Sequence, residues 1–285
     1  MIAAFESEHQ VLGPWSLETS KRFWEGFSPS ALAASGAPDE IRATFLSDTD
    51  WTRVDAVVTQ GEGTVRIAVA GPGDLRAATH QVRRFLSLDI DGRAWPAVGD
   101  RDPVIGDAQH RLPGFRPCGF YSPYEAAAWA VLSQRVRITQ ASSLKADLVE
   151  AHGDDGAFPA PSVLLGLDLG LPGRKNEYLH AVAEAASAGL LSGAYLRGLD
   201  SDDALRQVRS ITGLGPFASE LVVIRGANFP DVLPQNERRL EEEIARLYGP
   251  GRTSGETADA WRPFSAGAGV HLRALRELRM GEFAG

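Results

Sequence analysis

The segment from Val208 to Leu240 holds the residues whose types and spacing could carry chemistry. Near its start, the run Ile211-Thr212-Gly213-Leu214-Gly215 separates two stretches with helical patterning. Glycines permit the backbone angles of a tight turn, and a helix that follows such a turn presents free N–H groups to an anion such as phosphate. The same glycines also fit a plain turn between helices. The spacing predicts a helix-hairpin-helix at about 201–226, with phosphate binding as one of two interpretations.

Helix-start residues place this hairpin in a largely helical part of the chain. Ser122-Pro123-Tyr124-Glu125 combines a capping serine, a proline suited to the first helical position and a glutamate that can complete a capping box. Beyond it, Gly and Pro punctuate a series of helical patterns. We expect further helices at 138–151, 176–188, 201–210, 217–226, 236–247, 256–262 and 267–280.

The first hundred residues have a different pattern. Ala56–Gln60 and Thr64–Val69 are rich in Val, Ile and Thr, and Gly61-Glu62-Gly63 lies between them, which predicts a β-hairpin. A helix is expected around Leu75–Leu86. Segment 92–116 is rich in Gly, Pro and Asp and is interpreted as a connector. We therefore expect a small α+β domain with its connector over 1–110 and a helical domain over 111–285.

Composition bounds the function classes. The chain has 285 residues, 44% hydrophobic and 23% charged, without an apolar run long enough for a membrane span. The single cysteine, Cys118, excludes an intrachain disulfide and a four-cysteine iron–sulfur cluster, and it favours a reducing cytoplasm. The six histidines lack the paired spacing of zinc sites. The net charge of −8 weighs against nucleic-acid binding, although the local distribution of charge matters more than the total.

Several other stretches share a pattern with one family. They are Tyr124–Val136, which ends in Leu-Ser-Gln-Arg-Val, Gly170–Ala186, Arg225-Gly226 followed after four residues by Asp231-Val232, and Trp261-Arg262-Pro263-Phe264. With the hairpin Ile211–Ser219, they resemble the helix-hairpin-helix DNA glycosylase superfamily, in particular the 3-methyladenine DNA glycosylase II branch. The resemblance covers about 115–275, and the N-terminal segment fits the branch's extra domain in length and position.

The resemblance implies a mostly α fold, with a two-lobed helical domain preceded by the small α+β domain. It also implies a monofunctional DNA glycosylase of base excision repair, which hydrolyses the N-glycosidic bond of an alkylated or damaged base after flipping the nucleotide. The expected partner is double-stranded DNA with a damaged base. We expect a monomer that needs no cofactor and makes no membrane contact.

Members of the family use an aspartate that opens a helix after the hairpin, with an apolar anchor three positions later. Its carboxylate stabilises the positive charge that develops on the sugar. Here the candidates are Asn236 and Glu237. Leu240 follows Glu237 by three positions and can point inward, whereas Arg239 holds that place after Asn236, so we expect Glu237 to be catalytic. Alternatively, Glu237 is a first-turn residue whose negative charge interacts favourably with the helix dipole, and the protein is a catalytically silent DNA-binding relative.

The resemblance also assigns residues to the base and to the duplex. Bifunctional relatives carry a lysine where this chain has Phe217, so no lyase step is expected. In the branch an aromatic ring at this place can stack on a flipped base, and Gln134 could hydrogen-bond base edges. Arg135 matches the wedge that fills the gap in the duplex. The alternatives are core packing for Phe217 and a solvated helix end for Arg135.

Further contacts are expected from both main chain and side chains. Gly213, Gly215 and Ala218 would approach DNA at the hairpin. Main-chain carbonyls matching Arg209, Ile211 and Leu214 hold a monovalent cation in relatives, so K⁺ or Na⁺ could bind there. Candidate phosphate contacts are Lys175, Arg225, Arg238 and Arg239. An aromatic pair that shapes the base pocket in the branch corresponds to Arg273 and Ala274, so methyladenine specificity is not assumed. A third interpretation, a protein-interaction scaffold, is mildly favoured by the net charge.

Overall fold

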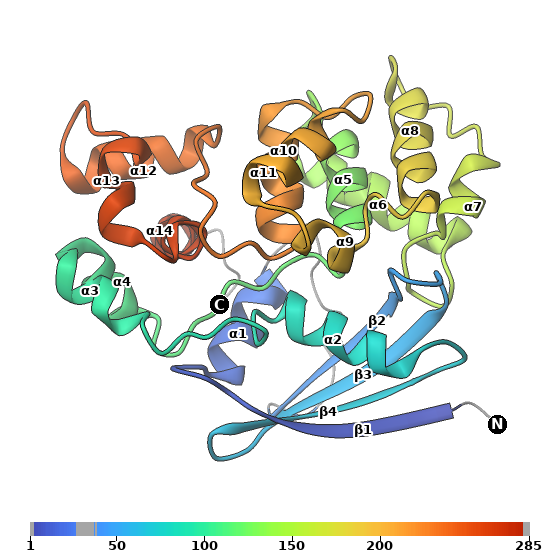
Figure 1. Cartoon of the computed structure of the whole chain (residues 1–285). Coiled ribbons are helices and arrows are strands. Elements are labelled where there is room, and N and C mark those ends of the chain that lie inside the picture. The colour runs from blue at the N-terminus through green and yellow to red at the C-terminus, as the bar shows by residue number, and fades with distance from the viewer. Residues whose placement is uncertain (1–2, 27–36, 38, 282–285) are drawn as a thin grey trace.

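The computed structural model describes residues 3–26, 37 and 39–281, and it shows a mostly helical protein with one antiparallel sheet near the N-terminus (Figure 1). The strands pair in the order β1-β4-β3-β2. Their bounds are β1 (Ala3–Gln10), β2 (Glu40–Leu46), β3 (Arg53–Gln60) and β4 (Thr64–Gly71). The β3–β4 hairpin confirms the prediction from alternation, whereas β1 and β2 were not predicted.

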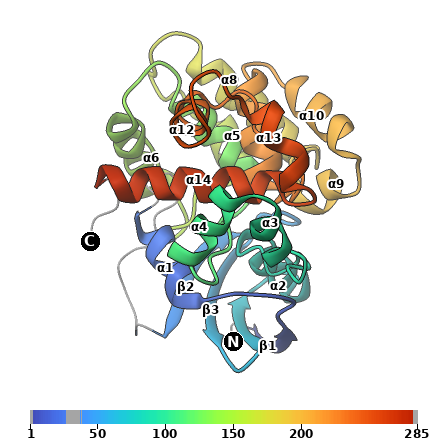
Figure 2. The ribbon, with the colours of Figure 1, turned by 90° about the vertical axis from the view of Figure 1, so that its left-hand side faces the viewer.

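One face of this sheet is apolar and covered. Burial alternates along β3 and β4, as expected for strands with one buried face. Two helices, α1 (Leu17–Gly26) and α2 (Leu75–Phe85), lie between the sheet and the rest of the molecule (Figures 1 and 2). The resulting sheet core includes Trp24 and Phe85, whose rings lie 5.1 Å apart. The sheet therefore supports the helical part of the protein.

The helical part has two lobes. The first lobe surrounds α5, whose ten residues are all buried. It consists of α5 (Pro123–Leu132), α6 (Ile138–His152), α7 (Pro161–Leu165), α8 (Lys175–Ser187), α9 (Gly193–Arg197), α10 (Ser201–Arg209), α11 (Pro216–Leu221) and the π-helical turn η2 (Val222–Gly226). The second lobe contains α12 (Arg238–Tyr248), α13 (Ser254–Trp261) and α14 (Ser265–Met280). Within the described residues, no helix has the length and apolar character needed to cross a bilayer.

The segment predicted as a connector, 92–116, instead contains two helices, α3 (Pro96–Arg101) and α4 (Pro103–Arg111). Each begins with proline at its first position, and the Asp102 carboxylate caps α4 by accepting from the amides of Val104 and Ile105. Val98 and Ile105 are fully buried in one cluster with residues of α12, α13 and α14. Pro and Asp thus start helices here, and this part of the connector prediction was wrong. Figure 2 shows α14 running beside α4 and below α12.

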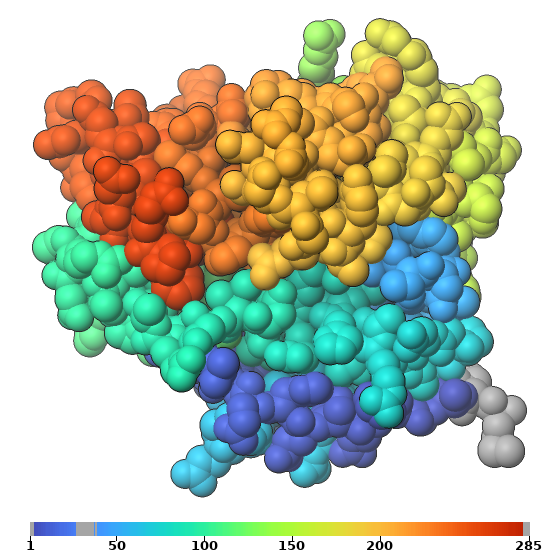
Figure 3. All heavy atoms as spheres, in the orientation of Figure 1, coloured from blue at the N-terminus to red at the C-terminus, as the bar shows by residue number. Residues whose placement is uncertain are grey.

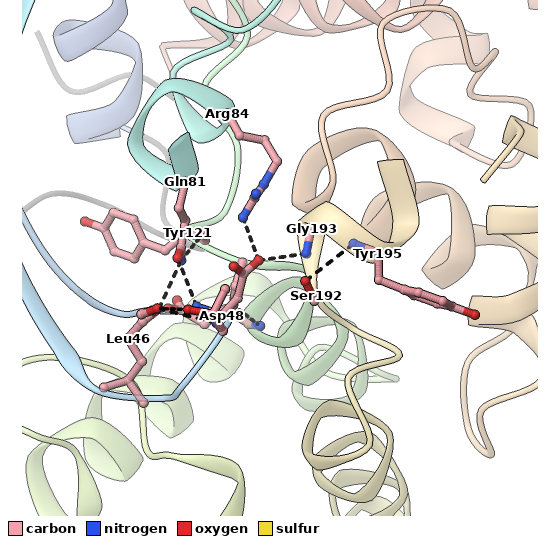
Figure 4. Close-up of polar contacts among 12 residues, drawn as sticks. Leu46, Asp48, Gln81, Arg84, Tyr121, Ser192, Gly193 and Tyr195 are labelled. Atoms are coloured by element: carbon pink, nitrogen blue, oxygen red, sulfur yellow. Dashed lines mark hydrogen bonds and ion pairs between the residues drawn. The ribbon is translucent and has the colours of Figure 1, made fainter. Parts of the chain in front are cut away.

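A buried polar cluster joins the sheet layer to the first lobe (Figure 4). The Asp48 carboxylate accepts from Arg84 Nη2 at 2.6 Å and from the Gly193 amide at 2.7 Å. Gln81 accepts from the Asp48 amide and donates to the carbonyls of Leu46 and Tyr121. Because a buried carboxylate is stable only when it is well paired, this cluster fixes α9 against the sheet layer. The space-filling view shows the helices and the sheet layer in continuous contact (Figure 3).

Candidate active site

The predicted hairpin is present, and its two glycines differ in their surroundings. Gly213, between α10 and α11, has φ of 93°, and an added Cβ would lie 2.3 Å from Tyr178 Cγ. Gly215 precedes α11 in an extended conformation, and an added Cβ there would meet nothing within 4 Å. Pro216 then occupies the first helical position. Gly213 is therefore required by the fold, whereas Gly215 leaves the surface of the turn open.

The end of α5 is attached to this turn. Gln134 Nε2 donates to the carbonyl oxygen of Gly213 at 2.9 Å. The ammonium of Lys175 donates to the Leu132 carbonyl at 2.6 Å, and its side chain is buried. Both contacts satisfy carbonyl oxygens that would otherwise lack a partner near a helix end or in a turn. The hairpin is thus attached to the turn after α5, and α8 is attached to the end of α5.

A cavity of about 430 Å³ lies beside the hairpin, between the two lobes. The ring of Phe217, on α11, lines it and is 47% exposed. Apolar walls are provided by Trp129 and Ile138 on one side and Val270 on another. The charged lining comes from Glu220, Arg225, Glu237, Arg238, Arg239, Arg273 and Glu277. The exposure of Phe217 contradicts core packing, the alternative that its sequence position had left open.

Glu237 lies at the start of α12 and faces this cavity. Its side chain makes no capping hydrogen bond and instead forms an ion pair with Arg273 Nε. Arg273 Nη2 also donates to Glu277 Oε1 at 2.9 Å. Leu240 is fully buried, whereas Arg239 is exposed, which confirms the predicted orientation of the helix. Arg273 thus links the Glu237 carboxylate, from α12, to α14.

Besides Glu277, sequence reasoning missed a second carboxylate in the cavity wall, that of Glu220. It is 6% exposed, and its oxygens accept from the Asn236 amide at 2.9 Å and from Asn236 Nδ2 at 2.5 Å. Asn236, the other candidate for the catalytic position, is therefore tied to α11. The spacing offered a signal, because residues three apart on a helix share a face and Glu220 follows Phe217 by three.

Comparisons with known proteins agree with this architecture. No protein-family model matches the chain. The chain is 31% identical over 214 residues to a probable bifunctional transcriptional activator/DNA repair enzyme AlkA of Mycobacterium tuberculosis. The aligned part covers 70% of this chain and 42% of that protein. It is 27% identical over 185 residues to a DNA-3-methyladenine glycosylase of Bacillus subtilis, covering 60% and 61%. The match spans less than two thirds of each relative. A solved 3-methyladenine DNA-glycosylase of Archaeoglobus fulgidus superposes with a TM-score of 0.75 over 95% of this chain and 98% of that one, at 19% identity.

The chain belongs to the helix-hairpin-helix DNA glycosylase superfamily. Its homologues are the AlkA-like 3-methyladenine glycosylases, and the predicted fold, mostly α with a small N-terminal α+β part, is confirmed. Another solved relative, the Schizosaccharomyces pombe 3-methyladenine DNA glycosylase Mag1 in complex with abasic DNA, covers 66% of this chain with a TM-score of 0.54.

Within this glycosylase fold, two predicted phosphate contacts are placed differently. Lys175 is buried with its ammonium on the Leu132 carbonyl, so its charge caps a helix end instead of facing DNA. Arg225 lines the cavity, but burial lowers its pKa and its Nη2 donates to the Cys118 carbonyl at 2.6 Å. The chain therefore uses both cations to support its own backbone, and neither is retained as a phosphate contact.

The remaining predicted residues lie at the surface of the hairpin and cavity. Arg135 is exposed in the turn after α5, with φ of 55°. Arg238 is also exposed, and its guanidinium pairs with Glu242 at 2.8 Å. The side-chain amide of Gln134 donates one hydrogen bond to the Gly213 carbonyl. The predicted contact of Gln134 with a base stays a prediction. The Arg273 position lines the cavity as expected from the branch, whereas Ala274 is buried in the sheet core.

The cation site predicted at Arg209, Ile211 and Leu214 also stays a prediction. The Ile211 carbonyl accepts from the Leu214 amide at 3.1 Å, which closes the turn. Among the described residues, no group of three or more His, Cys, Asp or Glu side chains is placed to hold a metal ion.

Proposed function

We propose that this protein is a monofunctional DNA glycosylase that removes an alkylated or otherwise damaged base from double-stranded DNA. The observation that carries the proposal is the meeting of Phe217 and Glu237 in one cavity beside the hairpin. Phe217 presents an exposed aromatic face, and Glu237 brings a carboxylate from a different helix. These are the two groups needed to stack a flipped base and to stabilise positive charge on its sugar.

DNA would approach the face formed by the hairpin and the end of α5. The first turn of α11 offers backbone amides that the helix cannot satisfy itself, and Gly215 leaves room for a phosphate. Arg135 and Arg238 are exposed cations on the adjoining elements. Arg135 would occupy the gap in the duplex while the flipped nucleotide enters the cavity.

The reaction is a hydrolysis at the anomeric carbon of the deoxyribose. The N-glycosidic bond breaks and its electron pair leaves with the base, while the oxygen of a water molecule bonds to the sugar carbon. The Glu237 carboxylate would stabilise the developing positive charge and accept the proton of that water. Phe217 offers no amine for an imine with the sugar, so the expected product is an intact abasic site.

A matched pair of variants tests this proposal. Duplexes with 7-methylguanine, 3-methyladenine, hypoxanthine or uracil are incubated with the protein, and abasic sites are scored. Glu237→Gln should lower base release about 100-fold or more while DNA binding is retained, because only the charge at the sugar is removed. Glu242→Gln, an exposed carboxylate on the same helix, serves as the control and should keep the full rate. Equal rates for Glu237→Gln and the intact protein would contradict the catalytic assignment.

The second candidate function is a catalytically silent DNA-binding protein of the same fold. The ion pair between Glu237 and Arg273 favours it, because a neutralised carboxylate stabilises positive charge less well. DNA binding without base release from any lesion would support this alternative. A scaffold without a DNA role would show no DNA affinity that falls steeply with salt.

A further inference from the structure

Glu220 and Asn236 connect the hairpin helix to the residue that directly precedes Glu237. Glu220 belongs to α11, and Asn236 ends the loop before α12. The Glu220 carboxylate accepts two hydrogen bonds from Asn236, one from its main chain and one from its side chain. Because both donors belong to one residue, the pair fixes the main chain at position 236 as well as the orientation of its amide.

Besides its ion pair with Arg273, Glu237 is held by contacts of its main chain and of its neighbours in sequence. Its carbonyl accepts from the amides of Leu240 and Glu241, which fixes the first turn of α12. Leu240 anchors that turn in the core, and Pro234 packs against Gly269, where an added Cβ would lie 2.8 Å from Pro234 Cγ. Between these anchors, Asn236 is the point at which the loop is attached to the hairpin helix.

The donor set also explains why position 236 carries an amide. A buried carboxylate such as Glu220 is tolerated when hydrogen bonds satisfy its oxygens. Asparagine supplies a side-chain N–H for this purpose, whereas aspartate has only acceptors when ionised. An aspartate at this position would place a second carboxylate against the first, which is unfavourable.

We propose that Glu220 is a positioning residue for Glu237, acting through Asn236. The hydrogen-bonded pair sets where the loop enters α12 and so directs the Glu237 carboxylate toward Arg273 and the cavity. The proposal rests on the glycosylase function proposed above, in which Glu237 is the catalytic carboxylate. It also assigns the asparagine of this chain a defined partner instead of treating it as a lost catalytic residue.

An exchange of donor and acceptor tests this pairing. In Glu220→Gln, the side-chain amide faces the amide of Asn236, and in Asn236→Asp, two carboxylates face each other. In the double variant, the oxygen of the introduced glutamine can accept from the main chain while its nitrogen donates to the introduced aspartate, so both hydrogen bonds return. Single-turnover base release at saturating enzyme should fall about tenfold in each single variant, the equivalent of about one 1.4 kcal/mol step. It should return to within about threefold of the intact protein in the double variant.

Controls distinguish a loss of positioning from a loss of stability, and from catalysis by a newly introduced carboxylate. Thr257→Val removes a hydroxyl on α13 that donates to the Ser254 carbonyl at 3.1 Å, away from the cavity, and should alter the unfolding midpoint without altering the rate. Folded Glu220→Gln with an unchanged rate would overturn the proposal, as would a double variant as slow as the singles. Adding Glu237→Gln to the double variant should abolish base release. Persistent release would mean that the aspartate introduced by Asn236→Asp had become the catalyst, which also overturns positioning.

A measurement of stability, which needs no catalysis, tests the positioning proposal separately from the proposed glycosylase function. Urea unfolding of Glu237→Gln, Arg273→Leu and their double variant measures the coupling between these two residues. The coupling should be present in the intact background and lost in Glu220→Gln, even if no lesion is processed. Coupling that survives Glu220→Gln would show that Glu237 is placed without Glu220.

Discussion

The hairpin and the start of α12 face the same cavity but are positioned by different kinds of contact. At the hairpin, the main chain dominates, because the geometry depends on the φ of Gly213 and on a carbonyl bound by Gln134. At the start of α12, side chains dominate, through the pairs Glu220–Asn236 and Glu237–Arg273. The hairpin should therefore be sensitive to added atoms, and α12 to changes of charge and hydrogen-bonding type.

The largest expected effect is that of Gly213→Ala. Alanine at this position would have to adopt the unfavourable positive φ of Gly213, and its methyl group would collide with the Tyr178 ring, so the free energy of unfolding should fall by about 3 kcal/mol. Urea unfolding and DNA titration measure the two consequences, and both stability and DNA affinity should drop. Gly215→Ala is the matched control, because its methyl group meets only open space.

Gly215→Ala should leave stability within about 0.5 kcal/mol of the intact protein and weaken DNA binding alone. The comparison between the two glycines would break down if both variants lost stability equally, or if neither changed DNA affinity.

An effect on stability that appears only in acid is expected from His271 on α14. Burial lowers the pKa of His271 to about 4, and its ring is enclosed by Trp95 and Phe115. In the unfolded chain a histidine has a pKa of about 6.5, so between these values the unfolded state binds the extra proton. Stability should fall as pH drops from about 6.5 to 4, by about 3 kcal/mol from this group at the lower end.

His271→Gln removes this titration. Unfolding free energies of both proteins, measured by urea titration from about pH 8 to about pH 4, should diverge in favour of the variant as the solution becomes more acidic. The difference at the alkaline end gives the packing cost alone, since His271 is then neutral in both states. Parallel curves over the whole range would show that the histidine is not responsible.

Arg273→Leu should have the smallest effect, a decrease in base release of about tenfold, or about 1.4 kcal/mol. The guanidinium holds Glu237 on one side and Glu277 on the other, so its loss frees the carboxylate to take other orientations. Single-turnover kinetics measure this decrease. In a Glu237→Gln background the same substitution should have no further effect, because Arg273 acts through Glu237. Additive losses would place Arg273 in direct contact with substrate.

Turn and cap chemistry allowed the local elements to be predicted, because it depends on neighbours in sequence. The Gly-x-Gly hairpin, the Ser122 start of α5 and the β3–β4 hairpin all follow from residues within a few positions of each other. The same local reasoning failed for 92–116, where Pro96 and Pro103 begin helices. Those short helices are stabilised by burial of Val98 and Ile105 against residues more than a hundred positions away. Such distant contacts cannot be predicted from the local composition.

For the site itself, the sequence determined the candidates and the tertiary structure decided their surroundings. The inward position of Leu240 could be deduced from its chemistry and its spacing from Glu237, and Phe217 from its place after the hairpin. The burial of Lys175 and Arg225, the ion pair of Glu237 with Arg273, and the hold of Glu220 on Asn236 could not. The physical reason is that a charged side chain takes its role from whichever partner the fold brings within hydrogen-bonding distance. Those partners come here from other segments of the chain, which the fold brings close.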